Sequence, residues 1–182
     1  MKIVQPIRDR EQIEQLKIVL RNQSYRNYFL FVFAINSGLR ISDILPLKVS
    51  DVKDKDHITL IEKKTDKHKR FLINPVLKGE IDKYIPGIGL NDYLFPSRNG
   101  QKNKPISRVM AYIILNSAAK QIGLCEFGCH ITRKTFGYYF YQKYKDVAML
   151  QRIFNHSSPA VTLRYIGIDQ DMQDKHMKDF YL

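Results

Sequence analysis

The sequence contains no tryptophan, only two cysteines and no long apolar run. Two cysteines cannot form the disulfide framework of a small secreted domain, so we expect free thiols in a reducing compartment. Cys125, Cys129 and His130 form a C-x3-C-H pattern, but no second pair of ligands accompanies it, so we predict no metal site. The longest apolar run, Tyr28 to Ile35, suits a core helix and is far shorter than the roughly 18 residues of a membrane span.

Acidic residues are scarce relative to basic ones. The 182 residues include 30 lysines and arginines against 18 aspartates and glutamates, which gives a net charge of +12 and a pI of about 9.7. Such an excess favours a polyanionic partner. Because Met1 to Pro6 has no apolar signal segment, we predict a cytoplasmic protein that binds nucleic acid rather than a membrane. An ordinary apolar content of 44% predicts one domain with a real core.

Periodicity and turn residues predict a mainly helical domain with a small antiparallel sheet. Strands are expected at 57–61 and 70–73, joined by a polar loop over 63–69, as a hairpin or within a three-stranded sheet. A left-handed turn is expected at Gly38, where the apolar second helix ends. Helices are predicted from a cap at Asp9 to Leu20 and at 24–36, 43–47, 74–84, 107–122, 132–143, 146–155, 159–166 and 170–181.

Arg40 follows the Gly38 turn and precedes a short predicted helix. Asp43, three residues further on, can hold its guanidinium in a fixed orientation. The pair fits a phosphate-binding arginine or an ion pair at a helix end that contributes little at a surface. Taken alone, these residues favour the ion pair.

The predicted hairpin loop carries a run of cations between Glu62 and Arg70. Such a loop is suited to contact phosphates or the minor groove of DNA, and a lysine on it can protonate a leaving alkoxide. A solvated run of charges is the other interpretation. Composition does not distinguish Lys63, Lys64 and Lys67 from one another.

His130 and Arg133 lie at the start of a predicted helix, on the same face. The arginine offers a planar fork of donors for phosphate oxygens, and the histidine can exchange a proton near neutral pH. A capping histidine beside a surface arginine fits the same residues. The aromatic residues that follow, from Phe136 to Phe140, are expected in the core.

His156 and Tyr165 flank a helix start, because Ser158 is a cap residue and Pro159 suits the first helical position. This arrangement can bring an imidazole and a phenol to one site. With a reference pKa near 10, a phenol is a poor nucleophile unless cations lie close. Tyr165 is one of eleven tyrosines, and taken alone it is better explained as a buried residue of a helix.

Taken together, the candidates resemble the catalytic set of the tyrosine recombinase (phage integrase) family: Arg40, Lys64, His130, Arg133, His156 and Tyr165. The likeness runs from Ile7 to Ile168 and includes the motif Ser37 to Asp43 and the Leu-Lys-x-x-Asp-Val sequence at 47–52. It also selects Lys64 from among its neighbours. The resemblance implies the catalytic-domain fold of DNA breaking–rejoining enzymes.

In that family's mechanism, Tyr165 would attack a DNA phosphate, form a 3′-phosphotyrosyl link and release a 5′-hydroxyl. Arg40 and Arg133 would bind the phosphate, and Lys64 would protonate the departing 5′-oxygen. No metal or other cofactor would be required, because the covalent link conserves the phosphodiester energy.

The resemblance gives the remaining polar residues supporting roles. His130 would accept or shuttle a proton, His156 would hydrogen-bond the phosphate, and Asp43 would orient an active-site arginine. Lys134 stands where many relatives carry histidine. The residues expected to contact DNA are Lys63, Lys67, Lys69, Arg70 and Lys134.

We expect a single catalytic domain over residues 1–182. The sequence departs from the resemblance in lacking a core-binding or arm-binding domain, as a catalytic fragment or as a naturally short relative. Double-stranded DNA is the expected partner, bound by a homotetramer of a chain that is monomeric when free, with an accessory DNA-binding protein as a further candidate. The tail over 168–182 is expected to dock on a neighbouring subunit or on its own domain.

The expected function is site-specific recombination by integration, excision or inversion, in a bacterial or phage-derived system. Three alternatives remain open from the residues: an inactive DNA-binding regulator of the same fold, a DNA-relaxing enzyme similar to type IB topoisomerases, and a purely structural basic helical domain.

Overall fold

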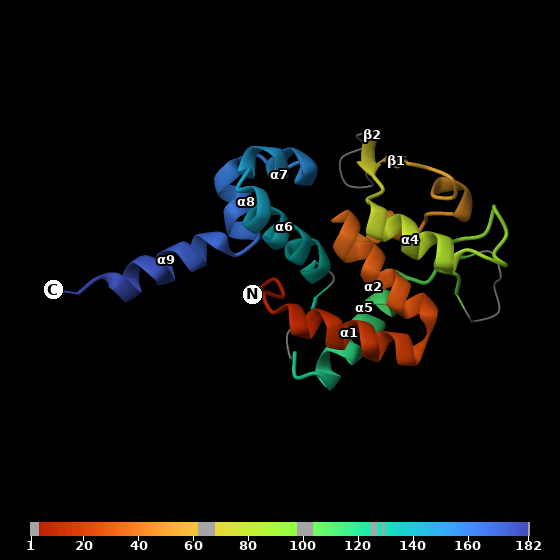
Figure 1. Cartoon of the computed structure of the whole chain (residues 1–182), viewed down its shortest axis with the longest axis horizontal. Coiled ribbons are helices and arrows are strands. Elements are labelled where there is room, and N and C mark those ends of the chain that lie inside the picture. Colours follow the sequence, from red (N-terminus) through yellow and green to blue (C-terminus); the bar gives the residue numbers. More distant parts are fainter. Residues whose placement is uncertain (1–3, 62–67, 98–103, 125–126, 129, 182) are drawn as a thin grey trace.

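The computed structural model describes residues 4–61, 68–97, 104–124, 127–128 and 130–181 (Figure 1). Helices dominate this part of the chain, and the strands β1 (His57–Ile61) and β2 (His68–Leu72) form one antiparallel pair. The α-helices are α1 (Arg10–Gln23), α2 (Tyr25–Ser37), α3 (Ile41–Ile44), α4 (Pro75–Tyr84), α5 (Arg108–Gln121), α6 (Ile131–Tyr144), α7 (Val147–Phe154), α8 (Pro159–Tyr165) and α9 (Ile168–Asp179), and η1 (Val49–Asp51) is a 3-10 turn. The predicted fold class is confirmed.

Most helices begin where a local cap predicted a start. In each case a side-chain oxygen accepts a hydrogen bond from a backbone N–H of the first turn, which satisfies a donor that has no partner within the helix. The capping residues are Asp9, Ser24, Asn74, Ser107, Asp146 and Ser158. Gly38 ends α2 in the left-handed conformation, as predicted.

Several element boundaries differ from the sequence-based expectation, including the ends of α1, at Gln23 rather than Leu20, and of α3, at Ile44 rather than Leu47. Strand β2 begins at His68 rather than at residue 70, because its pairing continues to the end of β1, where Ile61 faces His68. Helix α3 begins at Ile41, directly after Arg40, instead of at residue 43. Helix α9 begins at Ile168, because the left-handed Gly167 turns the chain directly into it.

The apolar side chains form two clusters on either side of α6. The larger cluster fills the space between α1, α2, α4 and α5 and includes stacked aromatic rings such as Phe29, Tyr84 and Phe95. The smaller one gathers α7, α8 and the start of α9 around Leu150, Phe154 and neighbouring residues. Figure 1 shows α6 between these two groups of helices. The junction of the clusters therefore lies along α6.

Helix α9 extends away from the body of the protein (Figure 1). Its buried residue is Ile168, at its base, whereas Met172, Met177, Phe180 and Tyr181 are exposed. The tail therefore exposes four apolar side chains within an otherwise mostly polar segment. Among the described residues, no helix has the length and apolar character needed to cross a membrane.

Candidate active site

Arg133 connects the two halves of the protein from the first turn of α6. It is 2% exposed, and its guanidinium donates to the carbonyl oxygens of Gly38 at 2.6 Å and Phe154 at 3.0 Å. These carbonyls end α2 and α7, where the helix dipole places partial negative charge. The guanidinium also lies 4.3 Å from the centroid of the Phe154 ring. Two backbone carbonyls thus help to hold a buried cation.

Two glycines allow the helices to approach around this arginine. An added Cβ at Gly38, where φ is 63°, would lie 2.4 Å from a ring carbon of Phe136. At Gly137, on α6, it would lie 2.7 Å from both Ile166 and Phe154. Contacts this short do not occur between real side chains, so both positions require glycine for the backbone to approach this closely.

Arg40 and Asp43 form a second, largely buried pair at the start of α3. An Nη of Arg40 lies 3.8 Å from an Oδ of Asp43, and their side chains are 15% and 1% exposed. The carboxylate therefore orients the arginine from the interior. The pair is much less exposed than a surface ion pair, and a positioning role for Asp43 stays a prediction.

Tyr165 is the last residue of α8, and its ring enters this cluster. Its hydroxyl lies 3.5 Å from Nδ1 of His130. The ring packs edge-on against His156, with centroids 4.9 Å apart, and against Phe154 at 5.6 Å. The phenol and both histidines therefore come together at the junction of the two apolar clusters.

His156 follows α7, which ends in a left-handed Asn155. Its Nδ1 lies 3.1 Å from the hydroxyl oxygen of Thr162, which is fully buried on α8. The Thr162 hydroxyl also lies within bonding distance of the Ser158 carbonyl oxygen, at 3.2 Å. The imidazole orientation is therefore set from the same short helix that carries Tyr165.

The surroundings of Tyr165 and His130 keep both side chains neutral at rest. Loss of hydration lowers the pKa of His130, and the neighbouring cations, Arg133 first, lower it further, so the ring is a neutral acceptor near pH 7. Burial raises the pKa of Tyr165, while Arg133 and Arg40 oppose this rise. The phenol thus stays protonated at rest, and both arginines stabilise the negative charge that develops when the proton leaves.

The structure brings together most of the residues that the sequence analysis selected as catalytic or supporting: Arg40, Asp43, His130, Arg133, His156 and Tyr165. Lys63, Lys64 and Lys67 lie outside the described residues. Arg70 is exposed and lies 3.0 Å from Nδ1 of His57. The amine of Lys69 donates to the Ile153 carbonyl, which connects β2 to α7.

Lys134 corrects one expectation. It was expected among the DNA-contacting cations, but it is 8% exposed and its amine donates to the Val4 carbonyl at 2.7 Å. The amine also lies 5.1 Å from the centroid of the Tyr165 ring, and burial lowers its pKa. The N-terminal segment covers this position, so Lys134 contacts the protein interior rather than a surface open to DNA.

Sequence reasoning missed the groups that hold the catalytic side chains. The carbonyls of Gly38 and Phe154 leave no signal in residue types, because every residue has a carbonyl. Thr162 could have been noticed, since it follows the Ser158 cap by one helical turn and therefore faces the end of the preceding helix.

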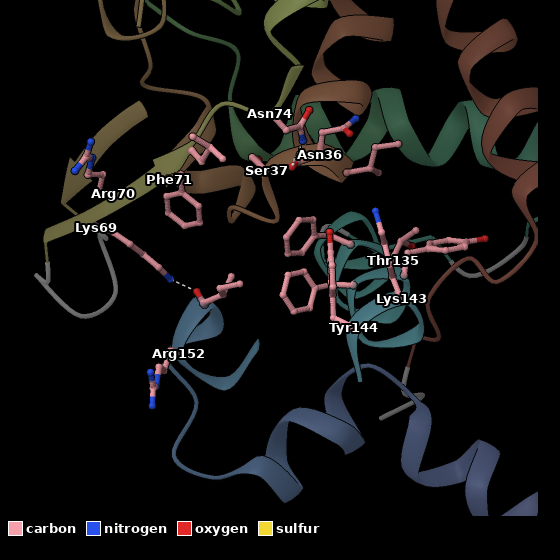
Figure 2. A pocket seen from close by; sticks show the side chains of 16 residues that line it. Asn36, Ser37, Lys69, Arg70, Phe71, Asn74, Thr135, Lys143, Tyr144 and Arg152 are labelled. Atoms are coloured by element: carbon pink, nitrogen blue, oxygen red, sulfur yellow. Dashed lines mark hydrogen bonds between the residues drawn. The ribbon is translucent and has the colours of Figure 1, made fainter. Parts of the chain in front are cut away.

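A pocket of about 740 Å³ lies beside the cluster, between α2, β2, α6 and α7 (Figure 2). Its walls are apolar and aromatic, and basic side chains stand around it: Lys69, Arg70, Lys143 and Arg152. None of the catalytic candidates described above lines this pocket.

Comparison with known proteins identifies relatives along nearly the whole chain. The model of the phage integrase family matches residues 8–172. The probable integrase/recombinase YoeC of Bacillus subtilis is 57% identical over 171 residues, covering 94% of this chain and 93% of that protein. The tyrosine recombinase XerH of Campylobacter jejuni is 26% identical over 83% of this chain but only 44% of its own length.

Solved structures share the fold. A crystal structure of XerA recombinase matches 97% of this chain and 65% of its own, with a TM-score of 0.74 at 20% identity. XerH bound to its difH substrate, in a pre-cleavage complex, matches 91% of this chain and 51% of its own, with a TM-score of 0.70. The chain thus spans about half the length of several of the recombinases it matches.

Proposed function

Because this chain belongs to the phage integrase family, we propose that it is a tyrosine-type site-specific DNA recombinase that acts through a 3′-phosphotyrosyl intermediate. One observation carries the proposal: the Tyr165 hydroxyl lies 3.5 Å from a neutral imidazole, in a cluster with two arginines and a second histidine. That arrangement supplies a nucleophile, a proton acceptor and phosphate-binding cations without a metal.

The reaction follows from these positions. The Tyr165 oxygen attacks the phosphorus while its proton passes to Nδ1 of His130. The new O–P bond forms as the bond to the 5′-oxygen breaks, and that oxygen takes a proton, for which Lys64 is the expected donor. Arg133 and Arg40 hold the non-bridging oxygens as charge develops, and each such contact typically lowers the barrier by about 2.7–4 kcal/mol.

Arg133 can serve both structure and catalysis. The bonds from Arg133 to the Gly38 and Phe154 carbonyls hold its guanidinium in one orientation. Its influence on the pKa of Tyr165 supports a position close to the phenol oxygen. We infer that the two carbonyls fix the orientation of the guanidinium and that its positive charge stabilises the phosphate during the reaction.

We propose that the partner is double-stranded DNA, bound in the cytoplasm of a bacterial or phage-infected cell. The net charge of +12 supports a polyanionic partner. Lys63, Lys67, Lys69 and Arg70 are the proposed contacts. We further propose a monomer that assembles as a homotetramer on DNA, with an accessory DNA-binding protein as a candidate partner and the projecting tail as the assembly element.

Capture of the covalent intermediate tests the function. The probe is a pool of nicked duplexes with a randomised core, because loss of the fragment beyond the nick traps the linked protein. We expect an SDS-resistant protein–DNA band with the wild-type chain, and no band with Tyr165→Phe although DNA binding persists.

Tyr112→Phe is the matched control, since it removes a hydroxyl from a tyrosine that is 40% exposed on α5. It should keep the band. A band formed by Tyr165→Phe would refute Tyr165 as the nucleophile, and tight binding without any band from the wild-type chain would refute cleavage.

A further inference from the structure

The N-terminal segment Val4–Arg8 lies across α6 and reaches the corner that follows the nucleophile. We propose that this segment is a strap that positions α8 and Tyr165, with Arg8 as its positioning residue. The consequence for catalysis rests on the proposed function, whereas the placement of the corner does not.

Arg8 attaches the strap to the corner between α8 and α9. Its Nη2 lies 2.6 Å from Oδ1 of Asp171 and its Nε lies 3.3 Å from Oδ2, so the guanidinium donates hydrogen bonds to both carboxylate oxygens. The same Nη2 donates to the Gly167 carbonyl at 3.3 Å. Gly167 is two residues beyond Tyr165, so this contact fixes the end of the helix that carries the phenol.

The rest of the strap is fastened to α6. The Ile7 amide donates to the hydroxyl of Thr135 at 3.0 Å, and the Tyr139 hydroxyl donates to the Arg8 carbonyl at 2.7 Å. At its other end, the Val4 carbonyl accepts from Lys134, whose amine lies over the Tyr165 ring. The strap therefore contacts the surroundings of the nucleophile at two separate points.

The corner and the strap also fit closely in shape. Gly167 has a φ of 78°, and an added Cβ would lie 2.7 Å from Gln5 and 2.9 Å from the Arg8 guanidinium. Pro6 would lie at 3.3 Å. No side chain fits between them, so a shift of the strap changes the space available to the corner.

These contacts couple the position of residues 4–8 to the distance between Tyr165 and His130. A molecule or chain segment that pulls the strap from α6 would release the corner and let α8 move. Since proton transfer requires the phenol within hydrogen-bonding reach of the imidazole, release of the strap should slow formation of the covalent link.

The first test needs no DNA. Amide hydrogen exchange of Gly167 and Asp171, followed by NMR, should be about three- to tenfold faster in Arg8→Ala than in the wild-type chain. Arg21→Ala is the matched control, because it removes the same charge from an exposed residue in the last turn of α1 that lies over the Tyr25 ring instead. This control should leave the exchange rates of both amides unchanged. The double variant Arg8→Asp with Asp171→Arg, in which the two charges are swapped, should restore the slow amide exchange of the wild-type chain.

The second test measures the covalent step in a single turnover at saturating protein. We expect Arg8→Ala to form the phosphotyrosyl link about three- to tenfold more slowly, with DNA affinity equal to that of Arg21→Ala. The double variant should recover most of the rate.

Each outcome decides between proposals. Unchanged exchange in Arg8→Ala, or equal effects of Arg8→Ala and Arg21→Ala, would overturn the strap. Faster exchange with an unchanged rate would also overturn it, because the corner would then not govern Tyr165. If the wild-type chain forms no link at all, the proposed function fails, and the exchange measurement alone decides the strap.

Discussion

The hydroxyl of Tyr165 lies 3.5 Å from Nδ1 of His130, although the two residues are 35 positions apart. The tyrosine ends α8 and the histidine precedes α6, so this contact exists only when the two helices are packed together. A protonated phenol therefore faces an imidazole whose pKa is lowered. The first prediction concerns proton transfer between these two side chains.

The rate of covalent link formation should depend on His130 and on pH. Burial and the nearby arginines lower its pKa from the ordinary 6.5, so the neutral ring persists below pH 6.5 and the rate should fall only at lower pH. His130→Gln should slow the step by about 10²- to 10⁴-fold and remove this acidic limb. The measurement is a single-turnover rate from pH 5 to 8.

The same shift should appear in stability. In the folded state His130 resists protonation, so the unfolded chain binds more protons as pH falls through 6.5, and the free energy of unfolding should decrease. Urea titrations of the wild-type chain and of His130→Gln should show a smaller acid-induced loss in the variant. An equal loss in both would contradict the lowered pKa.

Arg133 should be needed for folding stability as well as for activity. Arg133→Ala leaves the Gly38 and Phe154 carbonyls without this donor in the interior, and we expect a loss of about 2–5 kcal/mol in the free energy of unfolding. Arg133→Lys keeps the charge but cannot reach both carbonyls with a planar fork. Denaturant titration should rank the wild-type chain first, the lysine variant second and the alanine variant last.

Thr162→Val should affect catalysis more than stability. The substitution nearly preserves volume on a fully buried side chain but removes the hydroxyl that meets Nδ1 of His156. We expect the covalent step to slow by about five- to tenfold, which corresponds to one lost hydrogen bond. Thr162→Ser keeps a hydroxyl and should retain most of the rate, and equal rates for the two variants would contradict this role.

Gly137→Ala and Gly79→Ala should change stability in opposite directions. At Gly137 the new methyl group would lie 2.7 Å from Ile166 and Phe154, so overpacking should cost about 1–3 kcal/mol. At Gly79, within α4, nothing lies within 4 Å of an added Cβ, so higher helix propensity should stabilise the protein by about 0.5–1 kcal/mol. Thermal unfolding of both variants against the wild-type chain provides the measurement.

Local signals predicted most helix boundaries. Caps such as Ser24 and Asn74 act on N–H groups only a few residues away, so their effect can be read without knowing the fold. The start of α9 was missed for the opposite reason. Gly167 adopts a left-handed turn against Gln5 and Arg8, which lie at the other end of the chain.

The sequence by itself determined the helical pattern, the basic surface charge and the residue types available for phosphate chemistry, because these depend on composition and short-range order. Only the tertiary structure decided how they are used. Arg133 donates to the Gly38 carbonyl, 95 positions away. Lys134 donates to the Val4 carbonyl, 130 positions away, and is therefore buried instead of facing DNA. Such contacts form only when distant segments pack together, and burial then sets the pKa values of His130 and Tyr165.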